Sequence, residues 1–218
     1  LIFDSLRWNA LSTTDAPFDY IIVNGIYGRL PADATADLLR FCRESLSPSG
    51  LLCVGYNTYP GAKTHDVIRD AMMLHVADAA SEREGIDGAR AALTLFSEGI
   101  ASGNLLAASL EDEVSRLRAS SDDELVNDYL VAGGSSCYFV EFASAMQEHG
   151  LSHIGDAQPQ IELGSIYGSN VGLVNSLLAF GKDRYQRQQY LDMAVGRKRR
   201  TSMVVAAQRM HEGESAPL

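Results

Sequence analysis

Basic residues are scarce in this chain. Its 218 residues include 18 Lys and Arg against 28 Asp and Glu, which gives a formal net charge of −10 at pH 7. A negative surface repels the phosphates of nucleic acids and anionic lipids, so we expect neither nucleic acid nor a membrane as a partner. The basic run at residues 197–200 is interpreted as a solvated turn between a helix and a strand, because four basic residues fall short of a nucleic-acid-binding tract.

Cysteines and long apolar runs are few as well. The three cysteines, Cys42, Cys53 and Cys137, are odd in number and do not have the spacing of metal ligands. We therefore expect no metal site and three free thiols in a reducing cytoplasm, with Cys42 on the inward face of a helix. No run of 18 apolar residues occurs, so no membrane-spanning helix is expected.

A glycine-rich cofactor turn is also missing. The seventeen residues before Phe18 contain no G-x-G motif and no acidic residue at the end of a second strand. Both features belong to the fingerprint that holds a dinucleotide, so a nicotinamide-dependent dehydrogenase is disfavoured.

Two apolar runs, each followed by a polar loop, are the main positive signal. Residues 18–24 (FDYIIVN) predict a central parallel strand buried on both faces, and residues 50–57 predict a second strand. Helical spacing over residues 32–46 places a helix between them, which makes a βαβ unit. Because ligands gather at the carboxyl ends of parallel strands, the polar residues after both strands are expected to share one site.

The rest of the chain divides into a helical part and a second α/β part. From residue 63 the sequence has helical periodicity and no strand pattern, which predicts three or four helices. In the first of them, Val67, Ala71, Leu74 and Asp78 share one face, and Ile68, Met72 and His75 lie beside it. A glycine series at 164, 168 and 172 is interpreted as a flexible loop. The expected elements after the helical part are a helix from 138, a strand at 151–156, a helix at 183–195 and a strand from 201.

The motif YNTYPG at residues 56–61, with the strand order around it, resembles the fourth and fifth strands of class I S-adenosylmethionine-dependent methyltransferases. It is most similar to the prokaryotic group that carries a methyltransferase regulatory domain and includes protein-lysine methyltransferases. Residues 136–142 (SCYFVEF) resemble the signature VYFHEF of that group, and residues 189–192 with 197–201 resemble its ending QYLDF…RRFRQT. Val140 stands where the group has a histidine.

The resemblance implies the fold and domain organisation. We expect an α/β fold, the C-terminal part of a Rossmann-like methyltransferase sheet with a helical insertion, in a chain whose cofactor-binding N-terminal half precedes it. The expected parts are core strands at 1–62, a helical regulatory lid at 63–135, closing helix and strands at 136–210, and a polar tail at 211–218.

The resemblance also implies S-adenosylmethionine as cofactor and a protein or peptide as substrate. Methyl transfer from a sulfonium depends on positioning and on a neutral amine nucleophile, which phenol and amide groups can hold. Expected catalytic residues are Tyr56, Asn57 and Tyr27. Expected cofactor-binding residues are Asn24, Gly25, Ile26 and Asn9, and expected substrate-binding residues are Tyr59 and Pro60.

Two functions from different classes remain open on the sequence. The first is a methyltransferase that modifies a protein side chain such as lysine. The second is a non-catalytic regulatory or protein-interaction module derived from a methyltransferase. The clustering of polar residues at strand ends favours the enzyme. The oligomeric state is left open.

Overall fold

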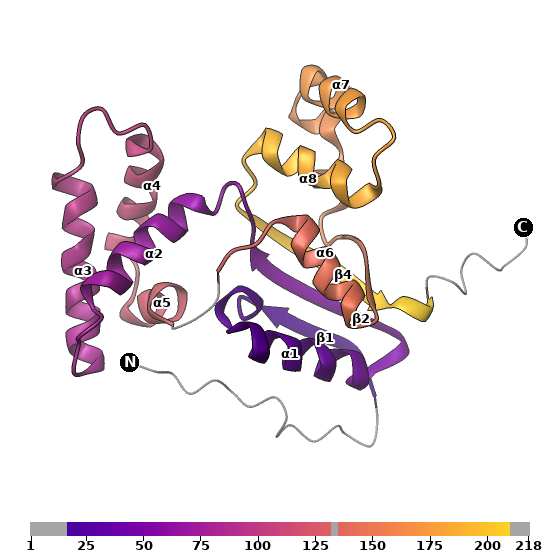
Figure 1. Cartoon of the computed structure of the whole chain (residues 1–218), viewed down its shortest axis with the longest axis horizontal. Helices are drawn as coiled ribbons and strands as arrows, with labels where there is room; N and C mark the ends of the chain where they lie inside the picture. The colour runs from indigo at the N-terminus through magenta and orange to yellow at the C-terminus, as the bar shows by residue number, and fades with distance from the viewer. Residues whose placement is uncertain (1–16, 132–134, 210–218) are drawn as a thin grey trace, which may run out of the picture. The chain divides into compact units, whose positions relative to one another are not determined.

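The computed structural model describes residues 17–131 and 135–209, and the chain forms two compact units (Figure 1). One is a helical unit, Ala62–Ser135. The other is an α/β unit built from the described segments on both sides of it, 17–61 and 136–209. The predicted polar tail at 211–218 lies outside the described residues.

The α/β unit contains a four-stranded mixed sheet. Its strands are β1 (Phe18–Asn24), β2 (Leu46–Asn57), β3 (Leu151–Asp156) and β4 (Arg199–Ala206), in the order β1-β2-β4-β3. β1 and β2 are parallel and are joined through α1 (Ala32–Ser45), whereas β4 runs antiparallel to both β2 and β3. The predicted βαβ unit and the two later strands are therefore present.

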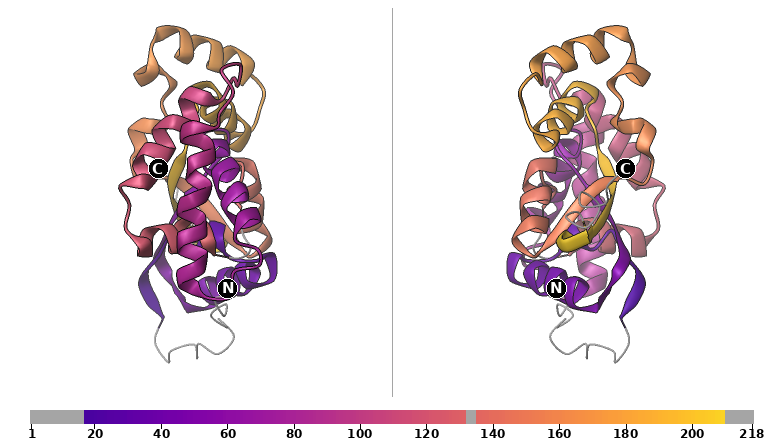
Figure 2. Two further views of the ribbon diagram at one scale, coloured as in Figure 1. Left: turned by 90° about the vertical axis from the view of Figure 1, so that its left-hand side faces the viewer. Right: turned by 90° about the vertical axis from the view of Figure 1, so that its right-hand side faces the viewer.

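Helices cover one face of this sheet. α1 and α6 (Phe139–Glu148) lie on the same side of the strands, which the two views of Figure 2 show. Cys42 is buried on the inward face of α1, as predicted. The buried apolar cluster between helices and strands contains Val23, Leu38, Leu39, Leu52, Val54, Phe139, Phe142, Met146, Leu151 and Val204.

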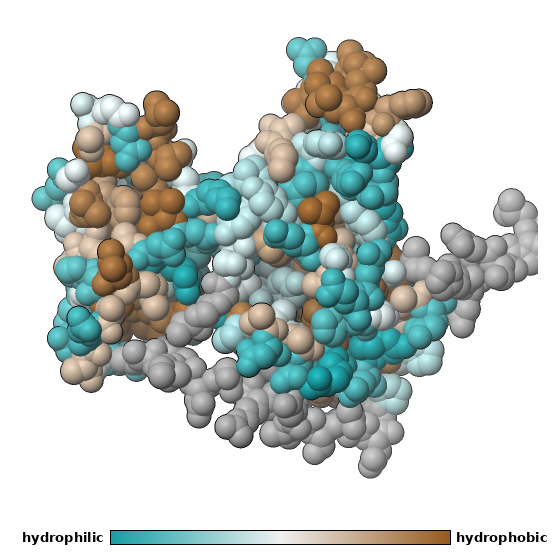
Figure 3. All heavy atoms as spheres, in the orientation of Figure 1, coloured by the Kyte–Doolittle hydropathy of each residue, from teal (hydrophilic) through white to brown (hydrophobic). Residues whose placement is uncertain are grey.

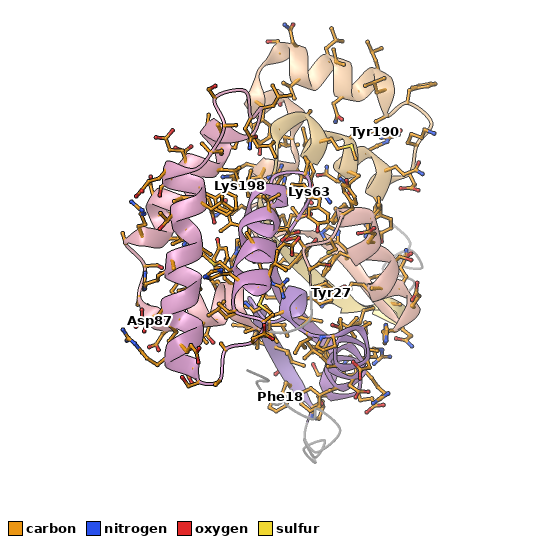
Figure 4. The ribbon with its side chains drawn as sticks, turned by 60° about the vertical axis from the view of Figure 1, so that its left-hand side comes forward. Phe18, Tyr27, Lys63, Asp87, Tyr190 and Lys198 are labelled. Atoms are coloured by element: carbon orange, nitrogen blue, oxygen red, sulfur yellow. The ribbon has the colours of Figure 1, made fainter. Side chains whose placement is uncertain are left out.

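The opposite face of β1 is open, which contradicts the expected burial on both faces. Phe18, Tyr20 and Ile22 are 41%, 76% and 75% exposed, and Figure 4 shows Phe18 at the start of the strand. Side chains alternate along a strand, so only Ile21 and Val23 reach the core beneath α1. Among the described residues β1 pairs only with β2, and it is an edge strand.

Two helices follow β3, and the first of them was not predicted. After the short turns η4 (Pro159–Glu162) and η5 (Gly164–Tyr167) come α7 (Ser169–Leu178) and α8 (Arg184–Val195). The interpretation of the glycine series as a flexible loop is wrong. A Cβ on Gly164 would lie 3.1 Å from the Cα of Gly172, so the two glycines let η5 and α7 pack closely.

The helical unit contains α2 (Lys63–His75), α3 (Glu82–Glu98), α4 (Ala107–Arg118), the single turn α5 (Asp122–Leu125) and the π-helical turn η3 (Val126–Leu130). Its core includes Ile68, Met72, Leu93, Leu110, Val114, Leu117 and Tyr129. On α2 the core side is formed by Ile68 and Met72, whereas Leu74 is 81% exposed and Val67 is 37% exposed. Among the described residues, no helix is both long and apolar enough to cross a membrane.

Candidate functional site at the strand ends

Asn24 and Asn57 end the two parallel strands on the open face of the sheet. The carboxamide oxygen of Asn24 accepts a hydrogen bond from Nη2 of Arg199 at 2.6 Å, and Arg199 stands opposite Asn57 in the β2–β4 register. Gly55, opposite Asn24 in the β1–β2 register, makes room for this amide, since a Cβ there would lie 2.5 Å from Asn24 Oδ1. Two carboxamides and a guanidinium therefore gather at the carboxyl ends of β1 and β2.

A tight turn follows β1 directly after Asn24. Gly25 has φ of 71°, in the left-handed region that glycine adopts without strain, and its N–H donates to the carbonyl of Gly55 at 2.9 Å. Ile26 leads into the single turn η2 (Tyr27–Arg29), and its carbonyl accepts from the N–H of Arg29 at 2.9 Å. The structure thus brings three predicted cofactor-binding residues together, whereas the fourth, Asn9, lies outside the described residues.

The two tyrosines expected to be catalytic lie in the core on the other face. Tyr56 is buried, its ring stacks on Phe142 at 4.2 Å between centroids, and its hydroxyl lies 3.3 Å from Oγ of Ser202. Tyr27 packs edge-on against both rings, at 5.7 Å from Tyr56 and 5.3 Å from Phe142. Burial raises the pKa of both tyrosines above the ordinary value, so the phenols stay protonated at neutral pH. Their catalytic role stays a prediction.

The loop from Thr58 to Gly61 is held by backbone hydrogen bonds on both sides. The N–H of Tyr59 donates to the carbonyl of Cys137 at 3.0 Å, and the N–H of Gly61 donates to the carbonyl of Arg197 at 2.9 Å. The Tyr59–Pro60 peptide is cis, and the Tyr59 ring meets Tyr138 edge-on at 5.1 Å. These contacts join the YNTYPG segment to the two later segments that carried the family resemblance. Sequence reasoning did not predict that contact.

A buried ion network lies beneath this region, and sequence reasoning missed it. Arg200 and Asp192 are almost completely buried, and Arg200 donates from Nε and Nη2 to the two carboxylate oxygens at 2.7 Å each. Arg197, also buried, donates from Nε to the same carboxylate. The interpretation of the basic run as a solvated turn is therefore wrong for these two arginines, although Lys198 and Arg199 are exposed.

Within the described residues, no group of three His, Cys, Asp or Glu side chains is arranged to hold a metal ion. Amide, guanidinium and backbone groups are instead the polar functions at the strand ends. Such groups hold carboxylates and amines by hydrogen bonds, which suits the positioning of an amino-acid-like cofactor or acceptor.

Comparison with known proteins places this geometry in a family context. Residues 104–206 match the family model described as "Predicted methyltransferase regulatory domain". The structure of PKMT2 from Rickettsia typhi matches 93% of this chain with a TM-score of 0.71 at 25% sequence identity. Residues 104–206 are thus similar to that regulatory domain, and the chain as a whole is similar in fold to PKMT2. The predicted fold class is thereby confirmed.

A second structure of PKMT2 from Rickettsia typhi, in complex with AdoHcy, matches with a TM-score of 0.70 at 27% identity. Both matches cover 38% of the PKMT2 chain. Two proteins of Rickettsia prowazekii (strain Madrid E) are similar in sequence. The uncharacterized protein RP789 is 28% identical over 190 residues, which are 86% of this chain and 34% of RP789. The uncharacterized protein RP028 is 24% identical over 150 residues, which are 66% of this chain and 60% of RP028.

Proposed function

We propose that this chain takes part in methyl transfer from S-adenosylmethionine to a protein side chain such as lysine. The observation that carries the proposal is the fold match over 93% of the chain to a structure that holds AdoHcy. AdoHcy is what S-adenosylmethionine becomes once its methyl group has left. For this chain, both S-adenosylmethionine as the cofactor and a protein side chain as the methyl acceptor are part of the proposal.

The strand-end geometry supports the same proposal. Arg199 donates to the carboxamide oxygen of the exposed Asn24, so the amide NH₂ is the group of this side chain that could donate to a ligand carboxylate. The turn at Gly25 and Ile26 lies directly beside Asn24, and the hydrogen bond from Gly25 N–H to the carbonyl of Gly55 holds the turn in place. We propose that these three residues hold the amino-acid end of the cofactor and that Asn9 lies near its adenine.

The acceptor side of the site follows from strand alternation. Adjacent residues of a strand point to opposite faces, so Asn57 shares the open face with Asn24 while Tyr56 points into the core. We propose that Asn57 contacts the acceptor amine and that Tyr56 and Tyr27 support the strand ends from below. Tyr59 and Pro60 are proposed to line the entry of the substrate, and the lid role of the helical unit stays a prediction.

Titration of AdoHcy into ¹⁵N-labelled chain, followed by NMR, tests the cofactor part. We expect the amide signals of Asn24, Gly25 and Asn57 to move and to saturate only at millimolar AdoHcy. The reason is that the glycine-rich turn and the ribose-binding carboxylate are missing from this sequence. Asn24→Ala should abolish the shifts, whereas Asn170→Ala, a change at an exposed asparagine of α7, should leave them unchanged.

Saturation at micromolar AdoHcy would show that the groups present here hold the cofactor unaided, contrary to the reasoning from missing contacts. Shifts confined to other parts of the chain would refute the strand-end site. For the transfer step, Asn57→Ala should lower turnover by ~10²-fold in a radiolabel transfer assay without changing the melting temperature. An equal loss of stability and activity would make Asn57 a structural residue.

A non-catalytic regulatory or interaction module is the second candidate. The family model that matches residues 104–206 is described as a regulatory domain, and one helix exposes an apolar surface. α7 carries no charged residue, and its Leu173 and Leu177 are more than 60% exposed, which appears as brown spheres over this helix in Figure 3. Absence of any AdoHcy-dependent shift at the strand ends would favour this candidate.

A further inference from the structure

A small pocket opens between β3, η4 and the first turns of α8, apart from the strand-end site. Its volume is about 160 Å³, and the polar side chains that line it include His153, Glu162, Arg184 and Arg187. None of the residues predicted for methyl transfer lines this pocket. It lies within residues 104–206, the stretch that matches the regulatory-domain model.

The floor of the pocket is a buried histidine with an unused nitrogen. His153 is 4% exposed, and its Nε2 has no hydrogen-bond partner among the described residues. The ring is held in place by the edge of Phe139 at 4.9 Å between centroids. Burial, and then the charges of Arg200 and Arg184, lower the pKa of His153 to about 3, so the imidazole is neutral at pH 7 and keeps one N–H. Buried polar groups nearly always have a partner, and an orphaned one calls for an explanation.

Two arginines stand at the mouth of the pocket. Nη2 of Arg184 donates to the hydroxyl of Tyr185 at 3.0 Å, and Nε of Arg187 donates to the carbonyl of Lys182 at 3.0 Å. A guanidinium has five N–H groups, so each arginine keeps donors for a ligand. Both side chains are exposed at their outer ends, which leaves the mouth open to solvent.

The acidic group of the pocket is already engaged. Oε1 of Glu162 lies 3.4 Å from Nη1 of the buried Arg200 and 4.0 Å from Nε2 of His153. The second distance is too long for a hydrogen bond. Arg200 also faces Asp192 at 2.7 Å and Asp156 at 3.9 Å, so it does not add to the charge of the pocket. The lining itself holds two arginines against one carboxylate, which leaves an excess of positive charge.

We propose that His153 carries its proton on Nε2 and that this pocket binds a small anion, a carboxylate or a phosphate, through that N–H at its floor and the guanidinium groups of Arg184 and Arg187 at its mouth. The volume equals that of about five water molecules, which suits a phosphate or a short carboxylic acid. The apolar walls, Phe139 and Ile154, would contact any short carbon chain of the ligand. Occupation of the pocket does not depend on the proposed methyl transfer.

Long-range ¹H–¹⁵N NMR of the imidazole nitrogens of the 218-residue chain tests the proposal. Inorganic phosphate and malonate are titrated separately at constant ionic strength, with chloride as the third anion. We expect one of the first two to move the Nε2 signal of His153 saturably, with a dissociation constant of roughly 1 mM or tighter, and chloride to leave it in place. A saturable shift with phosphate alone identifies the ligand as a phosphate, and a saturable shift with malonate alone identifies it as a carboxylate.

Variants of the two arginines at the mouth distinguish specific anion binding in the pocket from non-specific electrostatic attraction. Arg187→Gln and Arg184→Gln change exposed residues, and each should weaken binding about tenfold by removing a charge-assisted hydrogen bond. Arg83→Gln is the matched control, because Arg83 is an exposed arginine of α3, and it should leave the affinity unchanged. If neither anion moves the His153 signal saturably, or if both mouth variants bind as tightly as the original chain, the pocket holds only water and the proposal is wrong.

Discussion

Removal of the Asp192 carboxylate should be among the most destabilising single changes in the α/β unit. Asp192 accepts hydrogen bonds from Nε of Arg197 and from Nε and Nη2 of Arg200, and both arginines are buried. Asp192→Ala removes the carboxylate that Arg197 contacts, and it leaves Arg200 with only the longer of its carboxylate contacts, to Glu162 at 3.4 Å and Asp156 at 3.9 Å. Breaking a buried ion pair in this way costs about 3–5 kcal/mol. For a protein of this size that corresponds to a fall in melting temperature of about 6–20 °C.

Hydrogen exchange measured by mass spectrometry at increasing urea concentration is the assay, because it follows the two units separately. Peptides from α6 to β4 should lose protection at lower urea in Asp192→Ala, and peptides from α2 to α4 should not. Glu44→Gln, at an exposed acid of α1, is the matched control and should change the stability by less than about 0.5 kcal/mol.

A double variant tests the reason for the loss as well as its size. If the cost comes from the uncompensated charge, Asp192→Ala combined with Arg200→Met should be more stable than Asp192→Ala alone. A loss below about 1 kcal/mol in Asp192→Ala would refute the calculation. A double variant less stable than Asp192→Ala alone would show that Arg200 stabilises the fold through other contacts, such as its position 4.1 Å over the Phe139 ring.

Two further predictions concern the same unit. Gly61→Ala should destabilise it by about 2 kcal/mol or more, because a Cβ there would lie 2.2 Å from the carbonyl oxygen of Gly196 and 2.6 Å from the backbone of Arg197. Urea unfolding measures the loss, and a variant as stable as the original chain would contradict the prediction. His153 has a folded-state pKa of about 3, below the ordinary 6.5, so its contribution to stability is complete above pH 6.5 and is lost as the pH falls from there toward 3. The cost of His153→Gln, measured by urea unfolding, should accordingly be about 1 kcal/mol smaller at pH 5.5 than at pH 7, and equal costs at the two pH values would count against a neutral buried imidazole.

Local sequence was sufficient for most of the elements. Apolar runs ended by a polar residue and glycine predicted β1 and β2, and helical spacing predicted α1 and α8, because these signals depend only on neighbouring residues. The motif YNTYPG led to the methyltransferase relationship. Strand alternation could also have shown that Tyr56 and Asn57 point to opposite faces, although the sequence analysis grouped them in one site.

The tertiary structure decided which side chains contact one another. The burial of Arg197 and Arg200 depends on a carboxylate that α8 delivers, and the exposure of Ile22 depends on which face of β1 the helix α1 covers. The close approach of Gly164 to Gly172 depends on how η5 packs against α7. The lack of a hydrogen-bond partner for Nε2 of His153 likewise depends on which side chains the fold places around it. Periodicity shows that a segment has an apolar face. The free energies of desolvation and of ion pairing depend instead on the neighbours that the fold places against that segment, and a local sequence pattern does not reveal those neighbours.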